Sequence, residues 1–405
     1  MVKLEAPGGA TGGPTLAEIV QTAWPELQHA GFLSSHQWKT LRALVRCRTP
    51  ALGEHVYECT HCGKEHRVPH SCGNRHCPRC QGQQAIDWLE RQQANLLPIP
   101  YFHVVVTLPH ELNSLIRQNQ KLLFELLFAA GSKTLLEFGR RKWNAQLGLT
   151  AALHTWGQNL NDHYHLHCLV TGGGLNPEGT QWIGASAKYL FPIKALAIVF
   201  AAKYRDGLQQ LYAQGKLKFH GQLAPLSQPS AFQALMRQVT GKSWRVYAKR
   251  PFAGPSQVLA YLGRYTHRVA ITPRRLRRLD RVAGTVTFAW KDYADGQKRK
   301  EMTLSVVEFV RRFALHILPA RLAKIRHFGL LGNRNLRQRL AQARACLSQP
   351  SAQCIPDVES QSPTSAPTPE GPAPLACPYC RRGQLRLVAV LWPWRSPIVA
   401  LLDSS

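Results

Sequence analysis

The spacing of apolar residues along the chain predicts an alternation of helices and strands. Leu, Ile, Val and Trp recur at helical spacing between residues 15 and 46, which indicates two or three short helices. Residues 101–108 are rich in β-branched and aromatic side chains and are followed by Pro109, a pattern typical of a buried strand. The same reasoning predicts further helices over 83–97, 111–147, 191–215, 228–240, 257–265 and 304–318, and further strands over 149–157, 163–171, 244–249 and 285–290.

The two strands over 149–157 and 163–171 are joined by a turn rich in Asn and Asp, so we expect them to form an antiparallel pair. Strands, a long helix and a hairpin in this order favour an α+β fold, with a central antiparallel sheet flanked by helices.

Histidines alternate with other residues on the second strand of this pair. Side chains on a strand point alternately to opposite faces, so His165 and His167 share one face while Leu166 points to the other. Two imidazoles about 7 Å apart on one strand face are able to bind a single divalent cation. The candidates for a third ligand are His154 on the partner strand, His163 on the same face, and Gln257.

Cysteines and histidines cluster between residues 47 and 80. Because the chain is long and its Gly-rich N-terminus does not resemble a signal peptide, we interpret the cysteines as zinc ligands rather than as a disulfide framework. Two Cys-x2-Cys knuckles, Cys59/Cys62 and Cys77/Cys80, predict one tetrahedral zinc site. A second set of four is available in Cys47, His55, Cys72 and His76. A further Cys377-x2-Cys380 pair has no second pair near it in the sequence and is a weak zinc signal.

The charge of the chain indicates a polyanionic partner. There are 51 Lys and Arg against 23 Asp and Glu, a formal net charge of +28. An excess of this size costs self-repulsion unless a partner neutralises it, and nucleic acid is the first candidate. We find no run of about 20 apolar residues that would span a bilayer. We therefore expect a soluble, cytoplasmic protein. The Pro- and Ser-rich stretch over 349–376 is expected to be disordered.

A second group of candidate residues surrounds two tyrosines. Tyr261 and Tyr265 stand four residues apart on a predicted helix and share a face, where they would be core residues in the absence of other signals. The many cations around them favour a face that contacts a phosphate backbone. The candidate DNA-binding residues are Arg264, His267, Arg268, Arg274, Arg275, Arg277 and Arg278 here, with Arg75 and Arg79 in the cysteine-rich module.

Histidines that bind a metal and tyrosines that act as nucleophiles make up a coherent chemistry. The metal would polarise a phosphodiester, and a tyrosine oxygen would attack phosphorus, leaving a phosphotyrosine linkage and a free 3′ hydroxyl. The linkage keeps the bond energy, so rejoining needs no nucleotide. In agreement, Gly241-Lys242-Ser243 lacks the upstream Gly of a P-loop, since Met236 occupies that position.

These motifs resemble the two-tyrosine rolling-circle transposases of bacterial insertion sequences, within the histidine-hydrophobe-histidine (HUH) endonuclease superfamily. The resemblance covers about residues 35 to 335. It is carried by Cys47-Arg-Thr and by the runs 71–80, 154–157, 163–174, 261–271, 290–293 and 326–331.

The resemblance implies an HUH-type catalytic palm preceded by a small zinc-binding module. It implies Mg²⁺ or Mn²⁺ on His165 and His167, Tyr261 and Tyr265 as successive nucleophiles, and single-stranded DNA at the element's ends as substrate. The expected regions are an N-terminal flexible or helical segment (1–34), a zinc-binding, DNA-contacting domain (35–95), the catalytic domain (96–335), and a basic helix with a disordered linker and tail (336–405).

Two alternatives fit part of this pattern. A rolling-circle replication initiator or relaxase would use the same chemistry. A non-enzymatic zinc-finger DNA-binding protein would explain the charge and the cysteines, but it would leave the paired histidines and tyrosines without a role.

Overall fold

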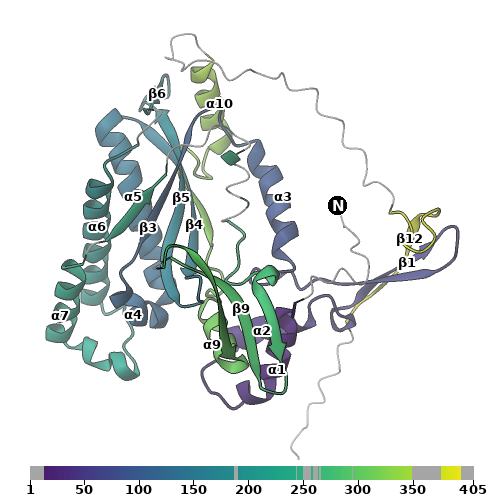
Figure 1. Ribbon diagram of the computed structural model, residues 1–405. Coiled ribbons are helices and arrows are strands. Elements are labelled where there is room, and N and C mark those ends of the chain that lie inside the picture. Colours follow the sequence, from purple (N-terminus) through teal and green to yellow (C-terminus); the bar gives the residue numbers. More distant parts are fainter. Residues whose placement is uncertain are drawn as a thin grey trace, which may run out of the picture.

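The computed structural model describes residues 13–186, 190–242, 244–249, 257–258, 263, 266–293, 295–348 and 375–393. These residues form an α+β fold, as the sequence predicts, in which a central antiparallel sheet is flanked by helices (Figure 1). Short 3-10 turns lie at Pro50–Leu52, His110–Leu112, Gly221–Ser227 and Pro273–Arg275.

The central sheet has the strand order β11-β4-β5-β3-β7, with β6 alongside the end of β5. Each neighbouring pair is antiparallel. The strands are β3 (Tyr101–Thr107), β4 (Gln146–Trp156), β5 (Asp162–Leu175), β6 (Trp182–Gly184), β7 (Arg245–Ala248) and β11 (Ile325–Gly329). The predicted hairpin of 149–157 and 163–171 is therefore the pair β4–β5, at the middle of the sheet.

The two faces of this sheet differ in what covers them. On one face, Leu149 and Leu153 of β4 and Leu166 of β5 pack with α5 and α6 in a large apolar core. The helices on this side are α4 (Asn113–Gln118), α5 (Gln120–Trp143), α6 (Ile193–Ala213) and α7 (Pro229–Thr240). The opposite face carries the histidines, and α3 (Gln81–Gln93) and α10 (Leu336–Leu347) lie on that side (Figure 1). None of the described helices is long and apolar enough to cross a membrane.

A second core joins the N-terminal helices to a smaller sheet. Helices α1 (Leu16–Leu27) and α2 (Ser35–Arg46) pack with α9 (Val306–Leu315) and with the sheet of β8 (Leu276–Asp280), β9 (Thr285–Asp292) and β10 (Lys298–Ser305). Cys47, Cys77 and Cys80 lie in the same core. Residues 1–34, 35–95 and 96–335 were predicted to form three separate regions. Segments of all three meet in this core, because the apolar face of α1 is buried against α9.

A ribbon of three strands joins the segment after α2 to the last described segment of the chain. Strand β1 (Glu54–Cys59) pairs with β2 (Glu65–Pro69) on one side and with β12 (Leu385–Leu391) on the other, both antiparallel. In Figure 1 the yellow C-terminal strand lies beside the purple-blue β1, away from the central sheet. The region after residue 335 therefore contains the predicted basic helix, α10, and also a strand that belongs to the N-terminal zinc-binding region.

Two kinds of element differ from the sequence prediction. The long helix predicted over 111–147 is divided at Asn119 into α4 and α5, and a 3-10 turn precedes α4. Helix α5 ends at Trp143, because Asn144 takes a left-handed conformation (φ 47°) and β4 begins at Gln146. Strands such as β10 and β12 were not predicted. Most residues of β10 are charged or polar, and none of its side chains is fully buried. The alternation of apolar and polar residues that predicts a strand is therefore weak in this segment.

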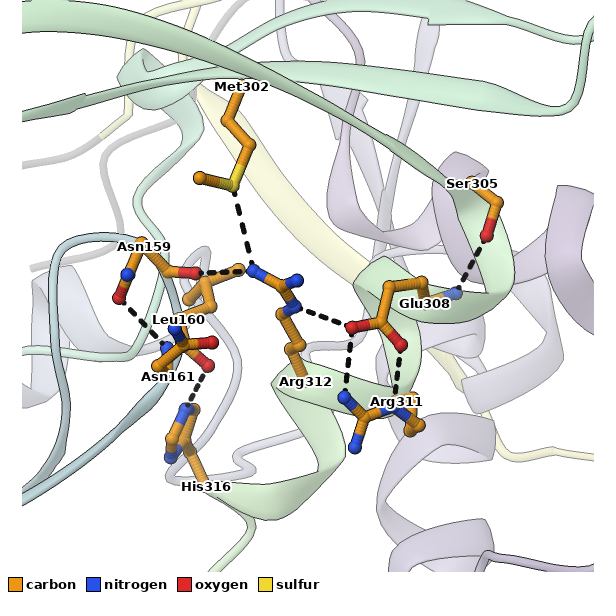
Figure 2. Close-up of polar contacts among 9 residues, drawn as sticks. All are labelled: Asn159, Leu160, Asn161, Met302, Ser305, Glu308, Arg311, Arg312 and His316. Atoms are coloured by element: carbon orange, nitrogen blue, oxygen red, sulfur yellow. Dashed lines mark hydrogen bonds and ion pairs between the residues drawn. The ribbon is translucent and has the colours of Figure 1, made fainter. Parts of the chain in front are cut away.

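Hydrogen bonds from a cationic and an imidazole side chain hold the turn between β4 and β5 in place. Leu160, at φ 62°, is fully buried, and its carbonyl oxygen accepts a hydrogen bond from Nε2 of His316 (3.0 Å). Arg312 of α9 donates to the carbonyl of Asn159 (3.3 Å) and is itself held by Glu308 (Figure 2). The turn that leads into the histidine strand is thus fixed by the second core.

His316 joins both sides of this turn. Its Nε2–H donates to Leu160, so its Nδ1 accepts the hydroxyl hydrogen of Thr155 in β4 (3.2 Å). The residue is buried, and burial lowers the pKa of His316 to about 4, which keeps the ring neutral at pH 7.

The pKa of His316 gives a prediction for acid stability. A histidine with a lowered folded-state pKa stabilises fully above its unfolded pKa of about 6.5, and this stability is lost as the pH falls toward 4. The contribution of this one group amounts to roughly 3 kcal/mol between pH 7 and pH 4. His316→Gln keeps a donor but cannot titrate, so urea unfolding of the variant should depend less steeply on pH than that of the wild type. Parallel curves for the two proteins would contradict the assignment.

Candidate active site and zinc centres

The register of the β4–β5 pair brings three histidines together. His154 lies directly opposite His165, and His167 follows on the same face of β5. One ring nitrogen from each of the three lies within 4.8 Å of the others. Nε2 of His165 and Nε2 of His167 are 3.1 Å apart, so their lone pairs converge on one point.

Neighbouring groups fix which nitrogen of each ring is available. Nδ1–H of His165 donates to the backbone carbonyl of His163 (2.7 Å), which leaves Nε2 as the lone-pair nitrogen. Nδ1 of His167 lies 3.0 Å from Nε2 of His103, and the two rings are stacked. Burial lowers the pKa of His165 and of His103 to about 3 and that of His167 further, so the rings are neutral.

This arrangement has the donor chemistry of a metal site. Metal-binding histidines generally donate their second ring N–H to a carbonyl or another acceptor, as His165 does to His163. Two ligands about 2.1 Å from one ion and at right angles to each other lie about 3 Å apart, close to the 3.1 Å between His165 and His167. The residues present therefore fit a divalent cation.

The three candidates for the third ligand occupy different positions. His154 belongs to the cluster of converging nitrogens. His163 is exposed and is outside that cluster, and it contributes its backbone carbonyl instead. Gln257 lies on helical backbone and is exposed, and its role as a ligand stays a prediction.

The predicted nucleophiles Tyr261 and Tyr265, together with Arg264, lie outside the described residues. Described residues of the same segment locate its packing. Val258 is fully buried, and a Cβ placed on Gly263 would lie 2.8 Å from Cδ1 of Leu89 in α3. His267 lies 5.5 Å from the ring of Trp88, also in α3. Gly263 and His267, which stand on either side of Tyr265 in the sequence, thus lie against the helix that follows the cysteines.

The cysteines form two clusters, and their membership differs from the prediction. The first contains Cys47, Cys72, Cys77 and Cys80, with Sγ–Sγ distances of 3.5 Å for Cys47–Cys80 and 3.6 Å for both Cys72–Cys80 and Cys77–Cys47. Tetrahedral zinc with Zn–S bonds of about 2.3 Å holds its sulfurs about 3.8 Å apart, so the spacing suits zinc.

The second cluster contains Cys59, Cys62, Cys377 and Cys380. The predicted set of Cys59, Cys62, Cys77 and Cys80 is therefore wrong as a grouping. The two knuckles are close in sequence, but β1 and β2 carry Cys59 and Cys62 along the ribbon, whereas Cys77 and Cys80 lie in the second core.

His55 and His76 do not join the first cluster. The ring of His55 packs edge-on against His70, at 4.5 Å between centroids. His76 accepts a hydrogen bond at Nε2 from the backbone N–H of Leu318 (3.2 Å), and burial keeps its pKa well below the ordinary value. Among the described residues, cysteines alone thus make up both sulfur clusters.

The candidate DNA-binding arginines fall into two groups. Arg75 donates to the carbonyls of Leu318, Pro319 and Leu322, which attaches the cysteine-rich module to the segment after α9. Arg275 likewise donates to backbone carbonyls, and Arg79 donates to that of Cys47. The exposed members are Arg274, Arg277 and Arg278.

Arg268 is half-buried near the histidine cluster. Its charge is among the causes that lower the pKa of both His165 and His167. Arg268 is thus a candidate DNA-binding residue whose charge acts on the histidine cluster.

Two residues that contact candidate site residues were not predicted. His103 lies on β3, where alternation puts it on the histidine face, but only the pairing of β3 with β5 brings it to His167. Lys324 donates to the carbonyl of Arg268, and its Nζ lies 5.1 Å from the ring of Trp156. Burial lowers the pKa of Lys324 to about 7. No local sequence pattern distinguishes Lys324 from the many other cations.

The two groups of arginines should respond differently to substitution. Arg75→Ala removes charge-assisted hydrogen bonds to buried carbonyls and should lower the free energy of unfolding by about 2 kcal/mol or more. Arg277→Ala should leave stability within about 0.5 kcal/mol. If Arg277 contacts a phosphate, its removal should reduce the salt slope of DNA binding by about 1. Denaturant unfolding and DNA-binding titrations at several salt concentrations measure these effects; a reduced slope for Arg75→Ala alone would reverse the assignment.

Two family models match parts of this chain. Residues 148–339 match the family described as a putative transposase, and residues 19–108 match a transposase zinc-binding domain. No solved structure is a significant match. The putative transposase y4qJ of Sinorhizobium fredii is 42% identical over 393 residues, which cover 94% of this chain and 96% of the relative. The transposase of insertion sequence element IS801 of Pseudomonas savastanoi pv. phaseolicola is 31% identical over 320 residues, which cover 77% of this chain and 74% of the relative. The chain therefore belongs to the family of insertion-sequence transposases represented by these proteins.

Proposed function

We propose that this transposase nicks and rejoins single-stranded DNA at the ends of an insertion sequence, through a 5′-phosphotyrosine intermediate, in rolling-circle transposition. The observation that carries the proposal is the convergence of His154, His165 and His167 on one face of the central sheet. A zinc-dependent DNA-binding protein without catalysis has no need of three imidazoles whose ring nitrogens converge on one point.

We assign the catalytic cation to His154, His165 and His167. When bound there, the ion would polarise the scissile phosphodiester and offset the charge that develops on its oxygens. An all-imidazole donor set suits Mn²⁺ better than Mg²⁺, which usually takes oxygen ligands and water. His103 orients the ring of His167, and the carbonyl of His163 orients that of His165.

The tyrosines supply the nucleophiles. The phenol oxygen of one tyrosine forms a bond to phosphorus, the bond from phosphorus to the 3′ oxygen breaks, and the phenol proton is transferred to that oxygen. The strand then ends in a 3′ hydroxyl, and its 5′ phosphate is on the enzyme. Attack by another 3′ hydroxyl reverses these steps and releases the tyrosine. Tyr261 and Tyr265 together allow a second cleavage while the first strand end is still held.

We further propose that Cys47, Cys72, Cys77 and Cys80 hold a structural zinc ion. These cysteines lie within the part of the chain that matches the zinc-binding domain, and their spacing suits tetrahedral coordination. Helix α3 begins directly after Cys80 and packs through Leu89 against Gly263, between the two tyrosines. The ion would thereby support the helix on which the nucleophile segment rests.

Covalent capture of DNA tests the tyrosine chemistry. Protein mixed with labelled single-stranded end DNA and Mn²⁺ should give an adduct that survives denaturant on a gel. EDTA should abolish it. Tyr261→Phe and Tyr265→Phe should each retain an adduct, and the double variant should retain none. If one single variant removes the adduct completely, only that tyrosine cleaves DNA. Binding without any adduct would favour a non-enzymatic role.

A matched pair of histidine variants tests the ligand set. His154→Ala removes a proposed ligand and should reduce adduct formation about 100-fold or more at limiting Mn²⁺, with partial recovery at high Mn²⁺. His163→Ala keeps the backbone carbonyl that orients His165, so its adduct yield should stay within about threefold of the wild type. The opposite ranking of the two variants would exclude His154 as the third ligand.

A further inference from the structure

The C-terminal segment 375–393 is built into the zinc-binding region. Strand β12 pairs with β1 along its whole length, from Glu54 opposite Leu391 to Cys59 opposite Leu385. The match to the zinc-binding domain covers residues 19–108 and does not reach this segment. The ribbon therefore contains cysteines from both ends of the chain.

The cysteines of the ribbon lie on two knuckles that face each other. Sγ of Cys59 is 3.6 Å from Sγ of Cys380, and Sγ of Cys62 is 3.8 Å from Sγ of Cys377. The S–S bond of a disulfide is about 2.05 Å long, so these sulfurs are not bonded to each other. Their distances are close to those between sulfurs that bind one tetrahedral zinc ion.

Backbone N–H groups point at the sulfurs, as they do at thiolates that bind a metal. Sγ of Cys59 accepts from the N–H of His61 and of Cys62 (both 3.4 Å), and Sγ of Cys380 accepts from the N–H of Gly383 (3.4 Å). These donors stabilise the deprotonated sulfur, which is the form that binds zinc.

The knuckles are in close contact. Hydrogen bonds join them directly, from the N–H of Thr60 to the carbonyl of Gln384 (3.0 Å) and from the N–H of Gln384 to Oγ1 of Thr60 (3.1 Å). A Cβ placed on Gly383 would lie 2.5 Å from Sγ of Cys59 and 2.7 Å from Cβ of His61. Only glycine permits this approach, so the two knuckles are fitted to one another.

Apolar burial alone does not account for the ribbon. Its apolar cluster, as far as the ribbon is described, contains Cys59, Cys377 and Leu385 as its buried residues. Several apolar side chains of β12 are exposed, among them Leu387 at 48% and Trp392 at 77%. A core this small needs a metal or a covalent link to hold its strands together.

We propose that Cys59, Cys62, Cys377 and Cys380 bind a second zinc ion, which fastens the C-terminal segment to the N-terminal zinc-binding domain. The ion would link residues 315 positions apart in the sequence, with the catalytic domain lying between them. This zinc site is separate from the Cys47 cluster and does not depend on the proposed DNA chemistry.

Metal content and cobalt spectroscopy test the second site in the full-length protein. The wild type should contain two zinc ions per chain, and Cys377→Ser/Cys380→Ser should contain one. Cobalt substitution should show thiolate-to-cobalt absorption and tetrahedral bands that fall by half in this variant. Two zinc ions in the variant, or one in the wild type, would overturn the proposal.

Alkylation of the native wild type provides a readout that does not require the variant to fold. Cys59, Cys62, Cys377 and Cys380 should be protected from N-ethylmaleimide together and should become reactive together when a chelator removes zinc, as mass spectrometry of peptides can follow. Reaction of Cys377 and Cys380 before chelation, with Cys59 and Cys62 still protected, would exclude shared coordination.

A glycine pair tests the fit of the knuckles. Gly383→Ala places a methyl group against Cys59 and should weaken retention of the second zinc ion about tenfold or more, measured by competition with a chelator. Gly82→Ala is the matched control, since Gly82 lies two residues after Cys80 and nothing lies within 4 Å of its Cβ position. Equal zinc retention by the wild type and Gly383→Ala would contradict the close approach.

Discussion

The register between β4 and β5 is the constraint on which the histidine cluster depends. If the pairing shifted by one residue, His165 and His167 would point toward α5, and Leu166 would lie on the face that now carries the histidines. The turn that sets this register is not held by its own residues alone. His316 and Arg312 bind its carbonyls, and both come from the segment that packs on the N-terminal helices. The geometry of the histidine cluster is therefore determined partly by a core that contains none of the three histidines.

The first sulfur cluster belongs to the same core. Cys47, Cys77 and Cys80 pack with Trp156 and Leu160, which flank the turn between the two strands. Arg75, in the loop between Cys72 and Cys77, anchors this loop to the carbonyls of residues 318–322. The part of the chain that matches the zinc-binding domain therefore shares an apolar core with residues of the central sheet. The cysteines of the first cluster and the turn that leads into the histidine strand thus belong to one apolar core.

Local patterns predicted much of this architecture, and non-local pairing accounts for most of what they missed. Alternation along β5 put His165 and His167 on one face, and the antiparallel hairpin made His154 a candidate. The irregular register between His154 and Trp156 prevented a unique choice from the sequence. The cysteine knuckles were recognised as pairs, because a Cys-x2-Cys spacing is local. Their partners depend on contacts between distant segments, which spacing does not encode, so the grouping was wrong.

The pairing of β12 with β1 has a consequence for the order in which the protein is made. Strands β1 and β2 leave the ribosome early, but β12 follows only after the entire catalytic domain. During synthesis β1 therefore presents an unpaired edge that the finished chain covers, and the ribbon is completed last. A nascent or prematurely terminated chain would carry an N-terminal region with one sheet edge open. The ribbon therefore becomes complete only when the last strand that the structure describes has been synthesised.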